Sequence, residues 1–169
     1  MVLCFQKDLL QALEHIDFTA YHEFVVHPLE RRRTIDSDEI IERYGAVKWE
    51  IVDMLNQEYS TILENNFDLY NWLNENSNDE LAYFLNEAGS NVLGYSDFGA
   101  PYKFHLWLGK KGFILGIEQK GKGFNAEEVC NKKIKENEGA AFNFFRNCRS
   151  EIFFDDSKNA RTVFMLFKI

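Results

Sequence analysis

Residues 77–93 read Ser-Asn-Asp-Glu-Leu-Ala-Tyr-Phe-Leu-Asn-Glu-Ala-Gly-Ser-Asn-Val-Leu and predict a central helix. Ser77 and Glu80 have the spacing of a capping box, which predicts that the helix begins here. Four apolar residues repeat at helical spacing and predict one buried stripe: Leu81, Leu85, Ala88 and Val92. Glu87 and Asn91 are one turn apart beside that stripe, where a carboxylate and a carboxamide could hold a metal-bound phosphate. The alternative for this pair is a solvated face of an ordinary amphipathic helix.

The residues upstream predict two helices and a short extended segment. Apolar residues at helical spacing predict a short helix over 5–16 and a long one over 36–63, with an extended segment at 24–26. The apolar stripe of the long helix is longer than a small sheet can cover, which predicts a possible homodimer through residues 38–63. His15, His22 and His27 lack metal-ligand spacing and are interpreted as structural.

The residues downstream predict two hairpins separated by a helix. The predicted elements are strands over 102–108 and 113–117 joined by a turn at 109–112, a helical start at 126–128, a helix over 139–149, and strands over 152–154 and 162–167. The expected fold class is α/β of the α+β type. It is a two-layer sandwich whose mixed, mostly antiparallel sheet is covered on one face by helices. Residues 1–40 are interpreted as an N-terminal extension and 41–169 as one domain.

Composition excludes several classes of function. The 169 residues carry 19 basic and 27 acidic side chains, a net charge of −8, which argues against nucleic-acid binding and against docking on anionic lipid. No apolar run is long enough to span a membrane, and charge follows the start too early for a signal peptide, so a cytoplasmic location is expected. Cys4, Cys130 and Cys148 are too few and too scattered for a disulfide framework or a zinc site, and free buried thiols are expected.

The order of these elements resembles the histidine-kinase-like (GHKL) ATPase superfamily, and is most similar to the anti-sigma-factor serine kinases. Residues 79–92 resemble the asparagine box of those kinases. The resemblance implies that Glu87 acts as a general base or orients water, and that Asn91 holds Mg²⁺. It extends over residues 79–169 and implies a Bergerat-type ATPase fold.

Two later segments resemble the glycine boxes of the same family. Residues 119–124, Gln-Lys-Gly-Lys-Gly-Phe, are similar to the first box, Asp-x-Gly-x-Gly-Phe, with Gly121 and Gly123 in place. Gln119 stands where the family has the Asp that recognises the adenine amino group. Gly139 matches the first glycine of the second box, and Ala141 replaces the next one.

The resemblance also assigns the residues between and after these boxes. Thr162, at the start of the last predicted strand, matches a threonine bonded to the adenine pocket. Residues 125–138 correspond to the ATP lid, in which Lys132, Lys133 and Lys135 could reach phosphate. Because this segment has few apolar residues, it is expected to be poorly packed without ligand.

The expected function is that of an ATP-binding regulatory domain of the anti-sigma-factor or histidine-kinase type. With Mg²⁺ and ATP as cofactors, it would transfer phosphoryl to a protein partner, but whether it is an enzyme stays open. Gln119 and Ala141 favour the alternative, a degenerate, non-enzymatic protein-interaction module that has lost nucleotide binding. A third option is a helical dimerisation adaptor built on residues 38–66.

Overall fold

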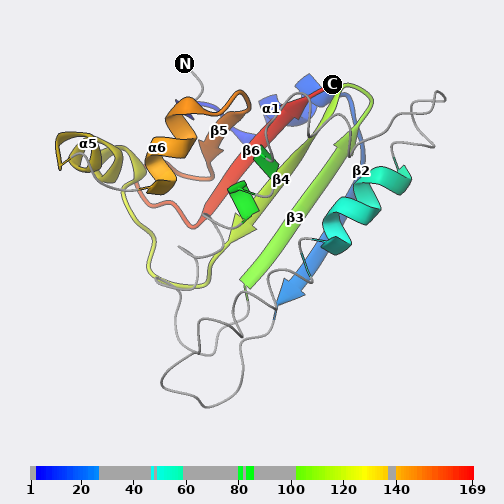
Figure 1. The fold of residues 1–169 in the computed structure, drawn as a ribbon, viewed down its shortest axis with the longest axis horizontal. Coiled ribbons are helices and arrows are strands. Elements are labelled where there is room, and N and C mark those ends of the chain that lie inside the picture. Colours follow the sequence, from blue (N-terminus) through cyan, green and yellow to red (C-terminus); the bar gives the residue numbers. More distant parts are fainter. Residues whose placement is uncertain are drawn as a thin grey trace, which may run out of the picture.

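The computed structural model describes residues 3–26, 47, 49–58, 80–81, 83–85, 102–136 and 140–169. Within these ranges six strands form a single sheet in the order β1-β5-β6-β4-β3-β2 (Figure 1). The strands are β1 (Leu3–Cys4), β2 (Phe18–Val26), β3 (Tyr102–Gly109), β4 (Gly112–Glu118), β5 (Glu151–Phe154) and β6 (Thr162–Lys168). Only β1 and β5 pair in parallel among the described strands, so the sheet is mixed and mostly antiparallel, as the sequence predicted.

The hairpin of β3 and β4 confirms the first pair of predicted strands. Gly109 pairs with Gly112 across a two-residue turn. Gly112 has a φ of +152°, and a Cβ there would lie 2.0 Å from the backbone oxygen of Phe167, so this corner of the sheet requires glycine. Along β3, Phe104, Leu106 and Leu108 are fully buried on one face, as their alternation predicted.

The two faces of the sheet pack against different helices. On one face, here called the helix-layer face, Phe104, Leu115 and Met165 belong to one large apolar cluster. That cluster also contains helical residues from 51–55, from 81–85 and from the helix α6 (Ala140–Asn147). The opposite face, here called the α1 face, packs against the helix α1 (Leu9–Ile16) through a second cluster. Its buried members are Ala12, Ile16, Ile114, Phe153, Phe164 and Leu166.

Helices therefore lie on both faces of the sheet, and the prediction of helices on one face is wrong. The reason is that the first segment of the chain belongs to the sheet. Residues 3–26 supply the edge strand β1, the edge strand β2 and α1 between them. Residues 3–26 of the segment that was interpreted as an N-terminal extension (1–40) are thus part of the sheet, and residues 27–40 lie outside the described residues.

The predicted short helix over 5–16 is confirmed as α1, which begins after Asp8. The carboxylate of Asp8 accepts a hydrogen bond from the backbone N–H of Gln11 at 2.8 Å, as an N-cap should. Asp17 ends the helix in the left-handed conformation, with a φ of 57°. Figure 1 shows α6 beside β5, with the helix α5 (Ala126–Glu136) further out at the left of the view.

Parts of the predicted helices lie outside the described residues. Residues 47 and 49–58 are helical, with Ile51 and Leu55 buried, and the rest of the predicted helix over 36–63 is outside. His27 and Gly139, the first glycine of the proposed second box, are also outside. Among the helices described, none combines the length and apolar character needed to cross a membrane.

Candidate functional site

The best placed of the predicted nucleotide-binding residues is Gln119, directly after β4. Its backbone N–H donates to the carbonyl of Arg161 at 3.0 Å, which holds the end of β4 against β6. Its side chain is 4% exposed, and Nε2 donates to the carbonyl of Lys122 at 3.3 Å. The other amide atom, Oε1, is buried, and the structure gives it no hydrogen-bond partner within the described ranges. Gln119 therefore has a buried acceptor that no described residue uses.

The glycine loop after Gln119 is packed on the turn between β5 and β6. Phe124 forms a β-bridge with Ala160, with backbone bonds of 3.1 and 2.7 Å. A Cβ at Gly123 would lie 2.1 Å from Oδ1 of Asn159, so this glycine permits close contact with a side chain of the protein itself. Gly121 is buried in the same loop. Chain packing thus accounts for Gly123, and a role for either glycine at phosphate stays a prediction.

Thr162 lies beside Gln119 in the backbone but on the other face of the sheet. Thr162 pairs with Glu118, and the next pair is Val163 with Ile117. Because side chains alternate along a strand, Thr162 shares the α1 face with Glu118, while Val163 belongs to the helix-layer cluster. The threonine is held by its backbone, whose N–H donates to Oδ1 of Asp155 at 3.0 Å. The pairing of β4 with β6 thus brings the backbones of Gln119 and Thr162 close together, but their side chains lie on opposite faces of the sheet.

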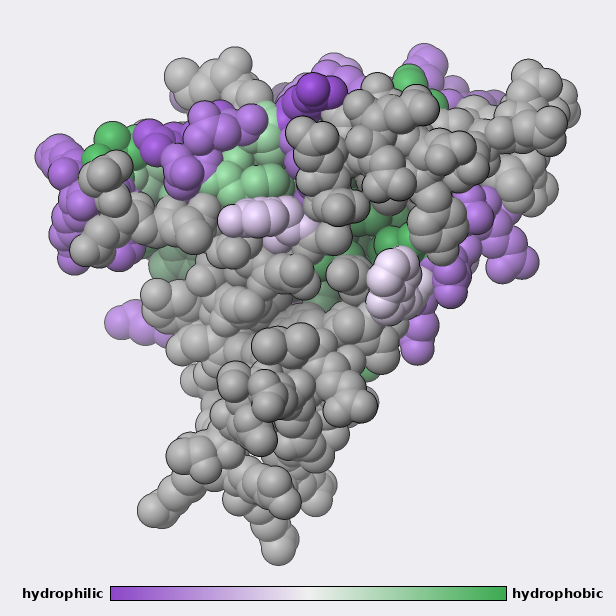
Figure 2. All heavy atoms as spheres, in the orientation of Figure 1, coloured by the Kyte–Doolittle hydropathy of each residue, from purple (hydrophilic) through white to green (hydrophobic). Residues whose placement is uncertain are grey.

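The lysines of the predicted lid lie on α5, which is longer than predicted. The sequence predicted a helical start at 126–128, whereas α5 runs for 11 residues with Ala126 and Cys130 buried. Lys132 is 69% exposed, and both it and Lys133 lie 3.9 Å from carboxylate oxygens of Glu136. Figure 2 shows the hydrophilic surface at this end of the molecule. A shallow hollow on it is lined by Asn125, Glu127, Glu128, Asn131, Lys132 and Lys135.

Of the four remaining predicted site residues, only Ala141 lies within the described residues. Glu87, Asn91 and Gly139 lie outside the described residues, so the asparagine box and the metal role of Asn91 stay predictions. Ala141 is in the first turn of α6. Among the described residues, no group of three or more His, Cys, Asp or Glu side chains could hold a metal ion.

Glu80 has a structural role that the capping-box pattern did not predict. Its side chain is buried, and its two carboxylate oxygens accept from the backbone N–H of Arg149 and, at 2.7 Å, from the hydroxyl of Ser150. These residues connect α6 to β5, so Glu80 fastens the helix of residues 80–85 to that corner. The other member of the predicted box, Ser77, lies outside the described residues.

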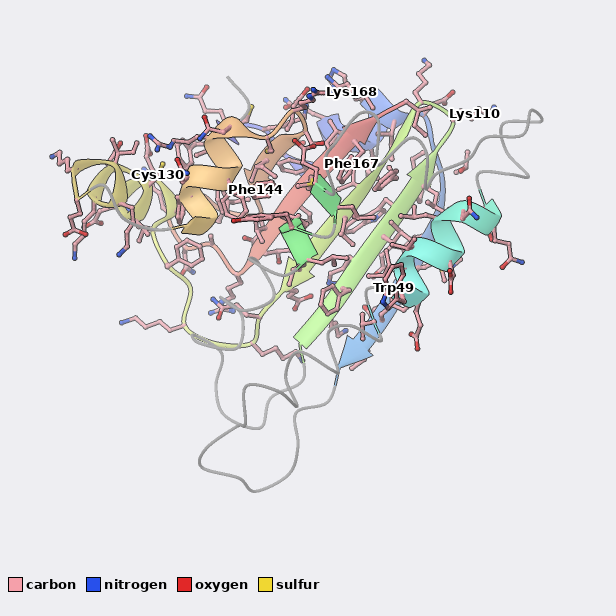
Figure 3. The ribbon with its side chains drawn as sticks, in the orientation of Figure 1. Trp49, Lys110, Cys130, Phe144, Phe167 and Lys168 are labelled. Carbon is pink, nitrogen blue, oxygen red and sulfur yellow. The ribbon has the colours of Figure 1, made fainter. Side chains whose placement is uncertain are left out.

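The structure confirms the expected free buried thiols for Cys130 and Cys148. Burial raises the pKa of Cys148 to about 12, and the nearby charge of Glu80 adds to this effect. Burial also raises the pKa of Cys130, which Figure 3 labels on α5. Cys4 is half-buried, and none of the three is in a disulfide. Thiols that stay protonated are poor nucleophiles, so neither Cys130 nor Cys148 is a candidate catalytic residue.

A second group of polar side chains, not predicted from the sequence, lies on the α1 face where three strands meet. His105 of β3 is 2.7 Å from the Tyr21 hydroxyl through Nδ1 and 2.6 Å from Glu118 through Nε2. Glu23 lies beside them, 3.2 Å from the Tyr21 hydroxyl and 3.1 Å from the ammonium group of Lys103. We call these five side chains the polar cluster. Only the register of β2, β3 and β4 brings them together, so no local sequence pattern could have found them.

The polar cluster keeps the Tyr21 hydroxyl protonated and oriented. Burial raises the pKa of Tyr21 to about 12, and the hydrogen bond to Glu23 and the charges of Glu23 and Glu118 act in the same direction. The Tyr21 ring lies 5.3 Å from that of Trp107, which in turn lies 5.7 Å from Phe164. The cluster is therefore continuous with the aromatic core under α1.

Comparison with known proteins adds no relative from which a function could be transferred. The chain matches no protein-family model, no curated protein and no solved structure. The functional assignment therefore depends on the residues and geometry described above.

Proposed function

We propose that this chain is an ATP-binding regulatory domain, of the type that its resemblance to anti-sigma-factor kinases implies. The observation that carries the proposal is the buried Oε1 of Gln119 at the end of β4, which has no partner within the described ranges. A buried carbonyl oxygen without a donor costs about 1–3 kcal/mol, which a bound donor would recover. The exocyclic amino group of adenine is such a donor.

The position of this acceptor supports adenine in particular. Gln119 occupies the place of the adenine-binding Asp in the resemblance, and the amide retains the ability to accept from an amino group. Its Nε2 is held by the Lys122 carbonyl, which orients Oε1. Gln119 would hold the base, and phosphate contacts would come from the lysines of α5. Transfer of phosphoryl to a protein partner, with Mg²⁺ on Asn91 and Glu87 as base, is the further part of the proposal.

Calorimetric titration with Mg²⁺-ATP tests the binding step. Gln119→Leu removes the acceptor at nearly constant volume and should abolish binding. The free energy of unfolding should change little, because the loss of the Nε2 bond to Lys122 opposes the relief of the unpaired Oε1. Gln11→Leu makes the same chemical change on the exposed surface of α1 and should bind as the parent does. Gln119→Asp with Ala141→Gly should bind about 5- to 150-fold tighter, because a charged acceptor forms the stronger hydrogen bond.

A non-enzymatic protein-interaction module is the second candidate, favoured by two observations. Asn159 occupies the space beside Gly123, and Thr162 is on the opposite face of the sheet from the helix layer. The parent and the double variant that combines Gln119→Asp with Ala141→Gly distinguish the two candidates. If neither protein releases heat with millimolar Mg²⁺-ATP, the nucleotide proposal is rejected and this second candidate takes its place.

A further inference from the structure

Among the described strands, β2 is an edge of the sheet, and half of its backbone hydrogen-bonding groups have no partner in the described ranges. Among the strands described, it pairs only with β3. It is nine residues long, and three of its apolar side chains are strongly exposed: Phe18 at 45%, and Tyr21 and Val25 at 43% each. Natural edge strands are usually short, charged or covered, because an open edge accepts further strands. An open edge of this length and character therefore suggests a docking function.

The hairpin of β3 and β4 determines which backbone groups of β2 face outward. Gly109 and Gly112 flank the two-residue turn and so exchange both of their backbone hydrogen bonds. Hydrogen bonding alternates along β3, so Phe104, Leu106 and Leu108 direct their backbone groups to β2. Their partners there are Phe24, His22 and Ala20.

The intervening residues of β2 consequently direct their N–H and C=O groups away from the sheet. These residues are Tyr21, Glu23 and Val25, and we call their outward groups the β2 edge. In the part of the chain that the structure describes, no hydrogen bond joins these groups to another segment. Their side chains all lie on the α1 face, where Tyr21 and Glu23 belong to the polar cluster. An added strand would thus gain main-chain hydrogen bonds and meet three exposed side chains.

We propose that the β2 edge binds an extended segment of another protein by strand addition, with a lysine or arginine of that segment placed opposite Glu23. Charge is the reason for a basic partner. The polar cluster contains Glu23 and Glu118 against the single ammonium group of Lys103. Glu23 carries a negative charge at neutral pH as an ordinary glutamate does, and the hydrogen bond from Lys103 lowers its pKa further. A second copy of this chain would instead bring its own net charge of −8. This inference is independent of nucleotide binding.

Titration of the ¹⁵N-labelled protein with a synthetic peptide tests the proposal. The peptide Thr-Val-Thr-Lys-Thr-Val-Thr, blocked at both ends, places valines opposite Tyr21 and Val25 and lysine opposite Glu23. We expect saturating amide shifts at these three residues. A peptide with glutamate in place of lysine should bind at least about fivefold more weakly. A peptide with an N-methyl group on the backbone nitrogen of the lysine, which removes a main-chain donor, should be weakened to the same degree. Shifts that map to another surface would overturn the proposal.

Two protein variants separate the backbone contribution from the charge. Val25→Pro removes an outward N–H that the β3 ladder does not use, so the protein should stay folded and lose peptide binding. Glu23→Gln should weaken the lysine peptide several-fold, while Glu127→Gln, which removes the same charge from α5, should not. Equal affinity for the lysine and glutamate peptides would overturn the proposal that a basic residue of the partner lies opposite Glu23. Sedimentation that shows a peptide-free dimer, dissociated by Val25→Pro, would assign the edge to a second copy.

Discussion

The two faces of the sheet are built from the same strands and yet differ in what they bury. On the helix-layer face, alternate residues of β3, β4 and β6 are apolar from end to end and belong to one cluster. On the α1 face the same strands divide into two halves. The half under α1 is apolar, with Ile114, Phe164 and Leu166, while the half toward β2 carries the polar cluster.

This difference separates the face that stabilises the fold from the surface that is free for recognition. A face buried along its whole length leaves no room for polar side chains, because each would need a buried partner. α1 is only eight residues long and covers one half of its face. The other half keeps charged and hydroxyl groups, which are hydrogen-bonded to one another. The experiments below test this division, from the largest expected effect to the smallest.

Truncation of an apolar side chain should be severe on the helix-layer face and mild at the β2 edge. Phe104 is fully buried, and Phe104→Ala should reduce the free energy of unfolding by about 3–5 kcal/mol through lost burial and a cavity. Val25→Ala, at a residue 43% exposed, should change it by less than about 0.5 kcal/mol. Urea unfolding measures both, and similar losses would contradict the division.

Loss of the buried carboxylate of Glu80 should rank second. Glu80→Ala leaves the N–H of Arg149 and the hydroxyl of Ser150 without their acceptor, at a cost of about 2–3 kcal/mol. Glu14→Ala removes a carboxylate from the exposed side of α1 and serves as the control in the same unfolding experiment. If the two variants are equally stable, Glu80 does not fasten its helix to the corner between α6 and β5.

A methyl group at Gly116 should disturb the point where the two halves of the α1 face meet. A Cβ there would lie 2.9 Å from the ring of Phe164 and 3.1 Å from that of Trp107. Gly116→Ala should therefore separate these rings and cost about 1–3 kcal/mol. Near-ultraviolet circular dichroism should show the altered surroundings of Trp107, and an unchanged spectrum would mean that the rings do not meet over β4.

The smallest effect concerns the charge of Glu151 and depends on pH. Burial by itself would raise the pKa of Glu151, but hydrogen bonds from Lys168 and Lys7 outweigh it and lower the pKa. Figure 3 labels Lys168 near the end of β6. A lowered pKa in the folded state stabilises the protein above the ordinary glutamate pKa, and this stabilisation is lost as pH falls through the folded value.

Glu151→Gln should accordingly be less stable than the parent at neutral pH, and the difference should shrink as pH is lowered to about 3. Thermal unfolding of both proteins across this range measures the effect. A difference that is constant with pH would show that the two lysines do not stabilise the carboxylate.

Much of the second half of the chain could be predicted because its strands have clear patterns. β3, β4, β5 and β6 lie within a residue or two of the predicted ranges, since one face of each is apolar and turn residues separate them. β2 was predicted only at 24–26. Its first residues are polar or half-exposed at a sheet edge, where alternation is weak. β1 has two residues, too few for any periodic pattern.

The positions of candidate site residues were predictable only where the neighbouring residues have a clear secondary-structure pattern. Gln119 follows a strand with a strong pattern, so its place at the end of β4 could be expected. The position of the Thr162 side chain on the other face of the sheet could not be expected, because it depends on the pairing of Thr162 with Glu118. The polar cluster combines residues from positions 21 to 118, and the contact of Asn159 with Gly123 joins two loops. Such contacts between distant segments have no sequence signal in a single chain.

The sequence by itself determined the α+β class, the hairpins and the apolar stripes, because strand and helix periodicity follow from backbone geometry that each segment carries on its own. The tertiary structure decided that residues 3–26 join the sheet at both edges, that α1 covers half of one face, and that β2 is left open among the strands described. These are choices among pairings that local periodicity leaves equivalent. They are settled by which arrangement buries the most apolar surface while keeping the polar groups hydrogen-bonded.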